Sequence, residues 1–219
     1  MNWLQLVRDV SILIGTWIAV YGIDSWRREH TGKRRLELAE DTLASFYEAR
    51  DAIQHMRSPV SFGAEVEDVK RGENESEKSW EARRNASVIL KRYNQHQELF
   101  NKLHATRYRF MAQIGKEESQ PFEDFRKLLN EITSSAHVLA RLWARDYFRN
   151  DEHFEKHRTL VEKYEAIFWE GIVDKDPVNP KLDLIINNIE KTCSNVISGE
   201  GTLYSLININ FFKKKKMSQ

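Results

Sequence analysis

A run of fourteen residues without a charge, Val10 to Ile23, restricts the structure of this chain more than any other feature. Arg8 and Asp9 precede the run and Asp24 follows it. Counted from Trp3 to Ile23, twenty-one residues form about 31 Å of helix, close to the thickness of a bilayer core. Aromatic residues near both ends, and no Ala-x-Ala cleavage site, favour a retained membrane span over a signal peptide. An interfacial helix and a buried core helix are the alternatives.

Basic residues cluster directly after this run. Five occur within nine positions: Arg27, Arg28, Lys33, Arg34 and Arg35. Positive flanks stay on the cytoplasmic side of a membrane. We therefore expect a single-pass protein in contact with membrane lipid, with a short N-terminus outside and most of the chain in the cytoplasm.

Small residues recur every three or four positions inside the run, at Ser11, Gly15, Ala19 and Gly22. In an apolar environment such a stripe lets two helix backbones approach closely. This spacing predicts a homo-oligomer that packs through the N-terminal helix, and ordinary use of glycine and alanine in an apolar segment is the alternative.

The rest of the chain has the spacing of helices. Only nine glycines and four prolines occur in 219 residues, and apolar residues recur at intervals of three and four. The first helix should continue to Ser58-Pro59. Further helices are expected over residues 77–114, 121–148, from Asn150 or Asp151 to the break at Asp176, and 180–198. The sequence predicts an all-α protein, with the N-terminal transmembrane helix continuing into a cytoplasmic antiparallel bundle.

This pattern divides the chain into five parts. They are a transmembrane anchor (1–26), a juxtamembrane helix (27–57), a loop (58–79), a helical bundle (80–198) and a basic tail (199–219). The tail has two aromatic residues before four lysines, which suits either an anionic lipid surface or a solubilising chain end.

The composition excludes several kinds of site. Lys and Arg number 34 against 33 Asp and Glu, so a general nucleic-acid-binding surface is not expected. The single cysteine, Cys193, excludes an internal disulfide. We expect no cofactor and no metal, because His153 and His157 lack the glutamate of a zincin helix. Arg50 and Arg107 fall on inward faces, where they form either internal hydrogen bonds or an anion-binding pocket.

A ribonuclease is the enzymatic alternative. Helical nucleases of the HEPN class carry an arginine, often followed by asparagine, and then a histidine after four to six intervening residues. Arg149-Asn150 with His153, and Arg92 with His96, resemble this motif, but the gap between arginine and histidine is only three residues. We therefore assign no catalytic residue.

Several segments resemble a group of uncharacterised bacterial proteins that have one N-terminal membrane helix and a cytoplasmic helical region. The segments are Leu43–Pro59 with Phe62-Gly63, Arg107–Ala112 with Pro121-Phe122, and Phe168–Gly171 with Asp176-Pro177. The resemblance reaches to about Ser198 and implies an inner-membrane location, an accessory or defence-associated role, and no assignable activity. Function is then expected through oligomerisation and binding of a protein partner. A membrane effector gated by a ligand and a membrane-tethered ribonuclease are the alternatives.

Overall fold

The computed structural model describes residues 3–60, 63–145 and 147–199. Over these residues the chain consists of six α-helices and two short 3₁₀ helices, without a strand. The predicted all-α class is confirmed. The chain forms two compact units, one of residues 1–41 and 196–219 and the other of residues 42–195. The predicted basic tail lies almost wholly outside the described residues.

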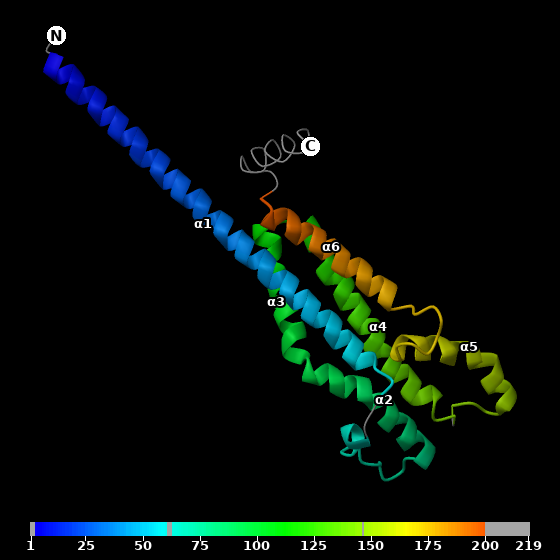
Figure 1. Ribbon diagram of the computed structural model, residues 1–219. Helices are drawn as coiled ribbons and strands as arrows, with labels where there is room; N and C mark the ends of the chain where they lie inside the picture. Colours follow the sequence, from blue (N-terminus) through cyan, green and yellow to red (C-terminus); the bar gives the residue numbers. More distant parts are fainter. Residues whose placement is uncertain (1–2, 61–62, 146, 200–219) are drawn as a thin grey trace, which may run out of the picture. The chain divides into compact units, whose positions relative to one another are not determined.

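The first helix, α1, is continuous from Trp3 to Arg57 (Figure 1). Its predicted end at Ser58-Pro59 is confirmed, and a proline disfavours helical conformation at the residue before it. Side chains are exposed from Arg8 to Arg35. Beyond Thr42, α1 buries one face, with Phe46, Ala49, Ile53 and Met56 at intervals of three and four. One helix therefore combines a fully exposed segment with an amphipathic one.

The prediction that the N-terminal part of α1 spans a membrane is wrong. Among the described residues, no helix has an apolar stretch long enough to cross a membrane. The uncharged run measures only about 21 Å at 1.5 Å per residue, against about 30 Å for a bilayer core. Longer windows include the ion pair Arg8–Asp9 or the pair Asp24–Arg28. This finding overturns the predicted location in the bacterial inner membrane with the N-terminus outside.

The expected helix over 77–114 is two helices, α2 (Glu77–Gln95) and α3 (Gln97–Gln113). Ser76 caps the start of α2, because its side chain accepts a hydrogen bond from the Ser79 amide. The break is at His96, whose backbone (φ −104°, ψ 9°) leaves the helical region. No glycine or proline marks this position, so the sequence pattern alone did not predict the break.

The remaining helices are α4 (Gln120–Leu142), α5 (Asp151–Phe168) and α6 (Asn179–Ile197), and the 3₁₀ turns are η1 (Gly63–Val66) and η2 (Glu117–Ser119). These three helices begin within one residue of the predicted ones, but α4 ends early and α5 ends at Phe168, eight residues before the predicted break at Asp176. The predicted cap of α5 at Asn150 is confirmed, since its side-chain oxygen accepts from the His153 amide at 2.8 Å. α4 ends six residues before the predicted Phe148. Arg145 follows it with φ 55°, a left-handed conformation that ends helices.

The core of the larger unit surrounds α4. The Phe46 ring of α1 meets Phe122 and Phe125 of α4 edge-on, with centroids 5.0 and 5.8 Å apart. Trp143, directly after α4, lies edge-on to Phe168 of α5. The Tyr47 hydroxyl of α1 donates a hydrogen bond to Glu190 of α6. Apolar faces spaced as the sequence predicts therefore bring α1, α4, α5 and α6 together.

Candidate functional site

The most exposed apolar surface of the described chain is the segment Val10–Ile23 of α1, here called the apolar segment. Its large side chains are exposed by between 45% (Val10) and 70% (Leu13 and Trp17). The set is Val10, Ile12, Leu13, Ile14, Trp17, Ile18, Val20, Tyr21 and Ile23. A continuous exposed apolar patch of this kind marks an interaction site in a folded protein.

The polar groups inside the apolar segment do little to change its character. The Thr16 hydroxyl donates back to the Ile12 carbonyl at 2.8 Å, so the helix itself satisfies it. The Trp17 and Tyr21 rings stack with centroids 5.7 Å apart. The surface therefore offers aromatic and aliphatic contacts around the whole helix.

The small residues of this segment lie opposite one line of its large residues. At 3.6 residues per turn, Val10, Leu13, Trp17 and Val20 form one line along the helix. The predicted packing residues Ser11, Gly15, Ala19 and Gly22 lie opposite that line, and all are exposed. A Cβ atom added at Gly15 or Gly22 would meet no other atom within 4 Å. The structure leaves both faces open.

Charged residues flank the apolar segment at both ends. Arg8 pairs with Asp9 at 3.3 Å, and Arg28 pairs with Asp24 at 2.9 Å. All five predicted basic residues are exposed, and only Arg28 among them forms an ion pair with a described residue. The end near Asp24 therefore carries a net positive charge.

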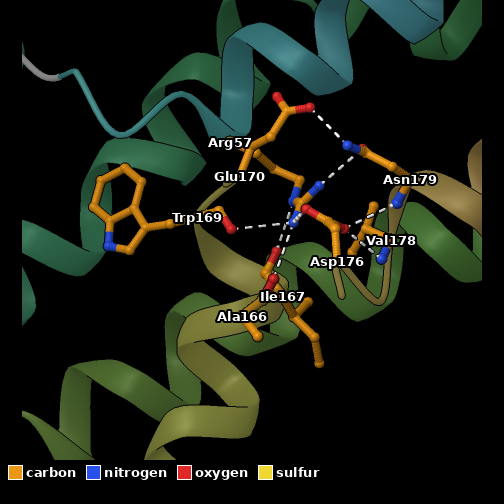
Figure 2. A network of polar contacts seen from close by, with 8 residues as sticks. All are labelled: Arg57, Ala166, Ile167, Trp169, Glu170, Asp176, Val178 and Asn179. Carbon is orange, nitrogen blue, oxygen red and sulfur yellow. Dashed lines mark hydrogen bonds and ion pairs between the residues drawn. The ribbon is translucent and has the colours of Figure 1, made fainter. Parts of the chain in front are cut away.

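The strongest polar network lies elsewhere, around the fully buried Arg57 at the end of α1 (Figure 2). Its guanidinium donates to the carbonyl oxygens of Ala166, Ile167 and Trp169 at 2.8–3.2 Å. It also donates to Asp176 at 2.8 Å and to the Asn179 side-chain oxygen at 3.1 Å. One side chain thus joins the end of α1, the end of α5 and the start of α6.

Asp176 completes this network. Its other carboxylate oxygen accepts from the backbone amides of Val178 and Asn179 at 2.7 and 3.0 Å, which caps the start of α6. Burial acts to raise the pKa of Asp176, but hydrogen bonds from Arg57 and these two amides outweigh it and hold the pKa below its usual value. The hydrogen bonds of Arg57 and Asp176 end on α5, on α6 and on the loop between them, so this network has a structural role.

A second buried arginine, Arg92 of α2, binds the C-terminal end of α1. It donates to the carbonyl oxygens of His55, Met56, Ser58 and Val60, and it pairs with Glu65 of η1 at 3.0 Å. The last carbonyls of a helix have no partner within the helix, and arginine supplies donors for them. The sequence pattern predicted this role for neither Arg57 nor Arg92.

Arg50 and Arg107 have different surroundings in the structure. Arg107 pairs with Glu123 and lines a cavity of about 50 Å³ among Phe100, Leu103 and Phe122. Arg50 is not among the residues lining that cavity, and its guanidinium lies over the Tyr47 ring at 5.8 Å. The Nε atoms of both arginines are buried without a hydrogen-bond partner. This arrangement does not support an anion pocket built on the two residues.

The two arginine–histidine pairs lie in different surroundings. Arg149 precedes the cap of α5 and lies outside the helix that carries His153. Arg92 is occupied by Glu65 and the end of α1. The Nε2 atom of His96 lies 3.0 Å from the Nδ1 atom of His55. Both histidines line a hollow of about 580 Å³, which Glu48, Asp51 and Glu98 also line. Burial first, and the neighbouring His55 second, lower the pKa of His96.

Histidines also pair in α5, where the rings of His153 and His157 lie 4.5 Å apart. The Nδ1 atom of His157 bonds to the His153 carbonyl oxygen at 2.8 Å. The described residues hold no group of three side chains able to bind a metal ion.

Comparisons with known proteins do not indicate a function for these features. No protein-family model, no curated protein and no solved structure matches the chain. The resemblance to bacterial membrane-helix proteins therefore stays a prediction, and the function is inferred from the exposed segment of α1 and its charged ends.

Proposed function

We propose that the protein is a helical assembly protein, which acts by self-association and partner binding through the apolar segment of α1 rather than by catalysis. The observation that carries this proposal is the exposure of nine large apolar side chains within fourteen residues. A helix that is apolar on all sides is stable when other chains surround it.

Energetics support association between copies. Full burial of one large apolar side chain contributes about 1.5–3 kcal/mol. Association costs about 4–15 kcal/mol in lost translational and rotational freedom. Burial of four such side chains on one face of each copy, Val10, Leu13, Trp17 and Val20, contributes free energy of the same order as this cost.

The buried polar groups support a structural role for the rest of the chain. Arg57 and Arg92 hold helix ends together, and Arg107 is neutralised by Glu123. The larger unit is then a rigid support for the helix that assembles.

A charge placed in the centre of the apolar segment tests the proposal. We expect Leu13→Asp in the full chain to convert the oligomer into a monomer, because a carboxylate in an apolar interface loses its hydration. Leu184→Asp in α6 is the matched control, since Leu184 is also an exposed helical leucine (61%, against 70% for Leu13). Sedimentation equilibrium measures the molar mass of each variant.

A decrease in mass for Leu13→Asp but not for Leu184→Asp supports assembly through α1. Circular dichroism should show an unchanged helix content, because Leu13 has no contact that the fold needs. A wild-type chain that is monomeric at every concentration tested would refute the proposed function.

A further inference from the structure

We infer that a second copy of this chain pairs with the apolar segment in antiparallel orientation, through the face that carries Val10, Leu13, Trp17 and Val20. This inference rests on the proposed function and adds the partner, the face and the direction. The spacing of this face and the charges at its ends favour the antiparallel direction.

The face extends beyond the apolar segment in both directions. Successive residues are seven positions apart in the series Trp3, Val10, Trp17 and Asp24. The same spacing holds for Leu13, Val20, Arg27 and Arg34. Trp3 and Trp17 are exposed by 75% and 70%. Residues with this spacing form the contact line of a two-helix coiled coil. The line is therefore apolar at its N-terminal end and charged at its C-terminal end.

A parallel pair would place like charges together along this line. Each residue of a parallel pair meets its own copy, so Asp24 would oppose Asp24, and Arg27 and Arg34 would oppose their copies. The five basic residues of one copy would also lie beside the five of the other. Like charges that face each other in this way destabilise a helix pair.

An antiparallel pair removes these conflicts. In an antiparallel pair, the numbers of two facing residues always add up to the same sum. If Leu13 faces Trp17 of the second copy, Val10 therefore faces Val20. In this register Arg27 reaches the exposed ring of Trp3 of the second copy, where a cation–π contact is favourable. The two Arg27 residues lie about 36 Å apart along the axis, beyond a Debye length of about 8 Å.

Single cysteines distinguish the two directions. In an antiparallel pair, Val10 lies next to Val20 of the other copy and about 15 Å from its own copy, too far for a disulfide. We expect Val10→Cys and Val20→Cys, each in the full chain, to give no covalent dimer alone. A mixture of the two, dissociated, recombined and then oxidised, should give a covalent dimer on non-reducing gels.

The native thiol does not interfere with this experiment. Cys193 is fully buried, and burial raises its pKa to about 12, so it stays protonated and unreactive in the folded chain. The wild-type chain under the same oxidation is the control and should remain free of covalent dimer.

Each outcome decides one question. Covalent dimers of Val10→Cys alone and Val20→Cys alone indicate a parallel pair and overturn the inference. Loss of all cross-links, while sedimentation still gives an oligomer, shows that another face assembles and also overturns it. A monomeric wild-type chain refutes the proposed function itself.

Discussion

Arg57 shows how much of the fold depends on one side chain. It has no exposed surface, and its five donated hydrogen bonds end on α5, α6 and the loop between them. The Glu170 amide also donates to the Arg57 carbonyl oxygen at 2.8 Å. A planar guanidinium can reach all of these acceptors, whereas an ammonium group cannot. Both the side chain and the backbone of Arg57 therefore fix the same junction.

Replacement of Arg57 is the first prediction at this scale. We expect Arg57→Met to lower the free energy of unfolding by about 3–5 kcal/mol, because Asp176 and three carbonyl oxygens lose their buried partner. Arg158→Met is the control, since Arg158 is 60% exposed and pairs only with Glu155 and Glu162, and should cost less than about 1 kcal/mol. Urea denaturation measures both. Equal stability of the two variants would show that the network is dispensable.

The sequence did not predict the buried arginines, for a physical reason. Periodicity identifies the face of a helix, and it assigned Arg50 and Arg107 to inward faces. Arg57 and Arg92 are buried because they satisfy the carbonyl oxygens where helices end, and that need depends on tertiary contacts. The proline after Ser58 marks the end of α1, and it is the one local signal that points to Arg57.

At the scale of single elements, the spacing of apolar residues predicted a helix correctly where one face of that helix is uniformly apolar. The apolar residues at intervals of three and four in the predicted helix over 121–148 are all buried or half-buried: Phe122, Phe125, Leu129, Ile132, Ala136, Leu139 and Trp143. α6 begins and ends within one residue of its predicted bounds. The break between α2 and α3 was missed because His96 has no helix-breaking chemistry of its own. Its position opposite His55 of α1 supplies a contact that the sequence pattern does not contain.

The pair of His55 and His96 makes this break sensitive to pH. The folded pKa of His96 lies below its unfolded value near 6.5, so the unfolded chain binds more protons between the two values. We therefore expect the free energy of unfolding to be highest above pH 6.5 and to fall as the pH decreases below it. Urea denaturation at pH 7.5 and pH 5 measures the difference.

His96→Gln should reduce this difference, because glutamine cannot gain a proton. His104→Gln is the control, since His104 is exposed on α3 and its ring lies beside Tyr108, away from the His55–His96 pair. Glu48, Asp51 and Glu98 line the hollow beside the pair and are unchanged in both variants. An equal pH dependence in wild type and His96→Gln would exclude the histidine pair as its source.

At the scale of the whole molecule, the question is whether residues 42–195 unfold as one cooperative unit. Cys193 reports on this, because its thiol is buried in α6, fourteen residues beyond the Arg57 partner Asn179. Burial raises its pKa to about 12, so a thiol reagent at pH 8 reacts only when the site opens. The labelling rate of Cys193 therefore measures how often this part of α6 becomes accessible.

A cooperative unit couples the distant Arg57 junction to this thiol. If Arg57→Met costs about 3 kcal/mol, labelling of Cys193 should accelerate by about two orders of magnitude, since each 1.4 kcal/mol is roughly tenfold. Leu13→Asp should leave the rate unchanged, because Leu13 lies outside residues 42–195. An unchanged rate in Arg57→Met would mean that α6 opens locally near Cys193. The junction at Arg57 would then stabilise only the helix ends that it touches, and the larger unit would contain at least two parts that open independently.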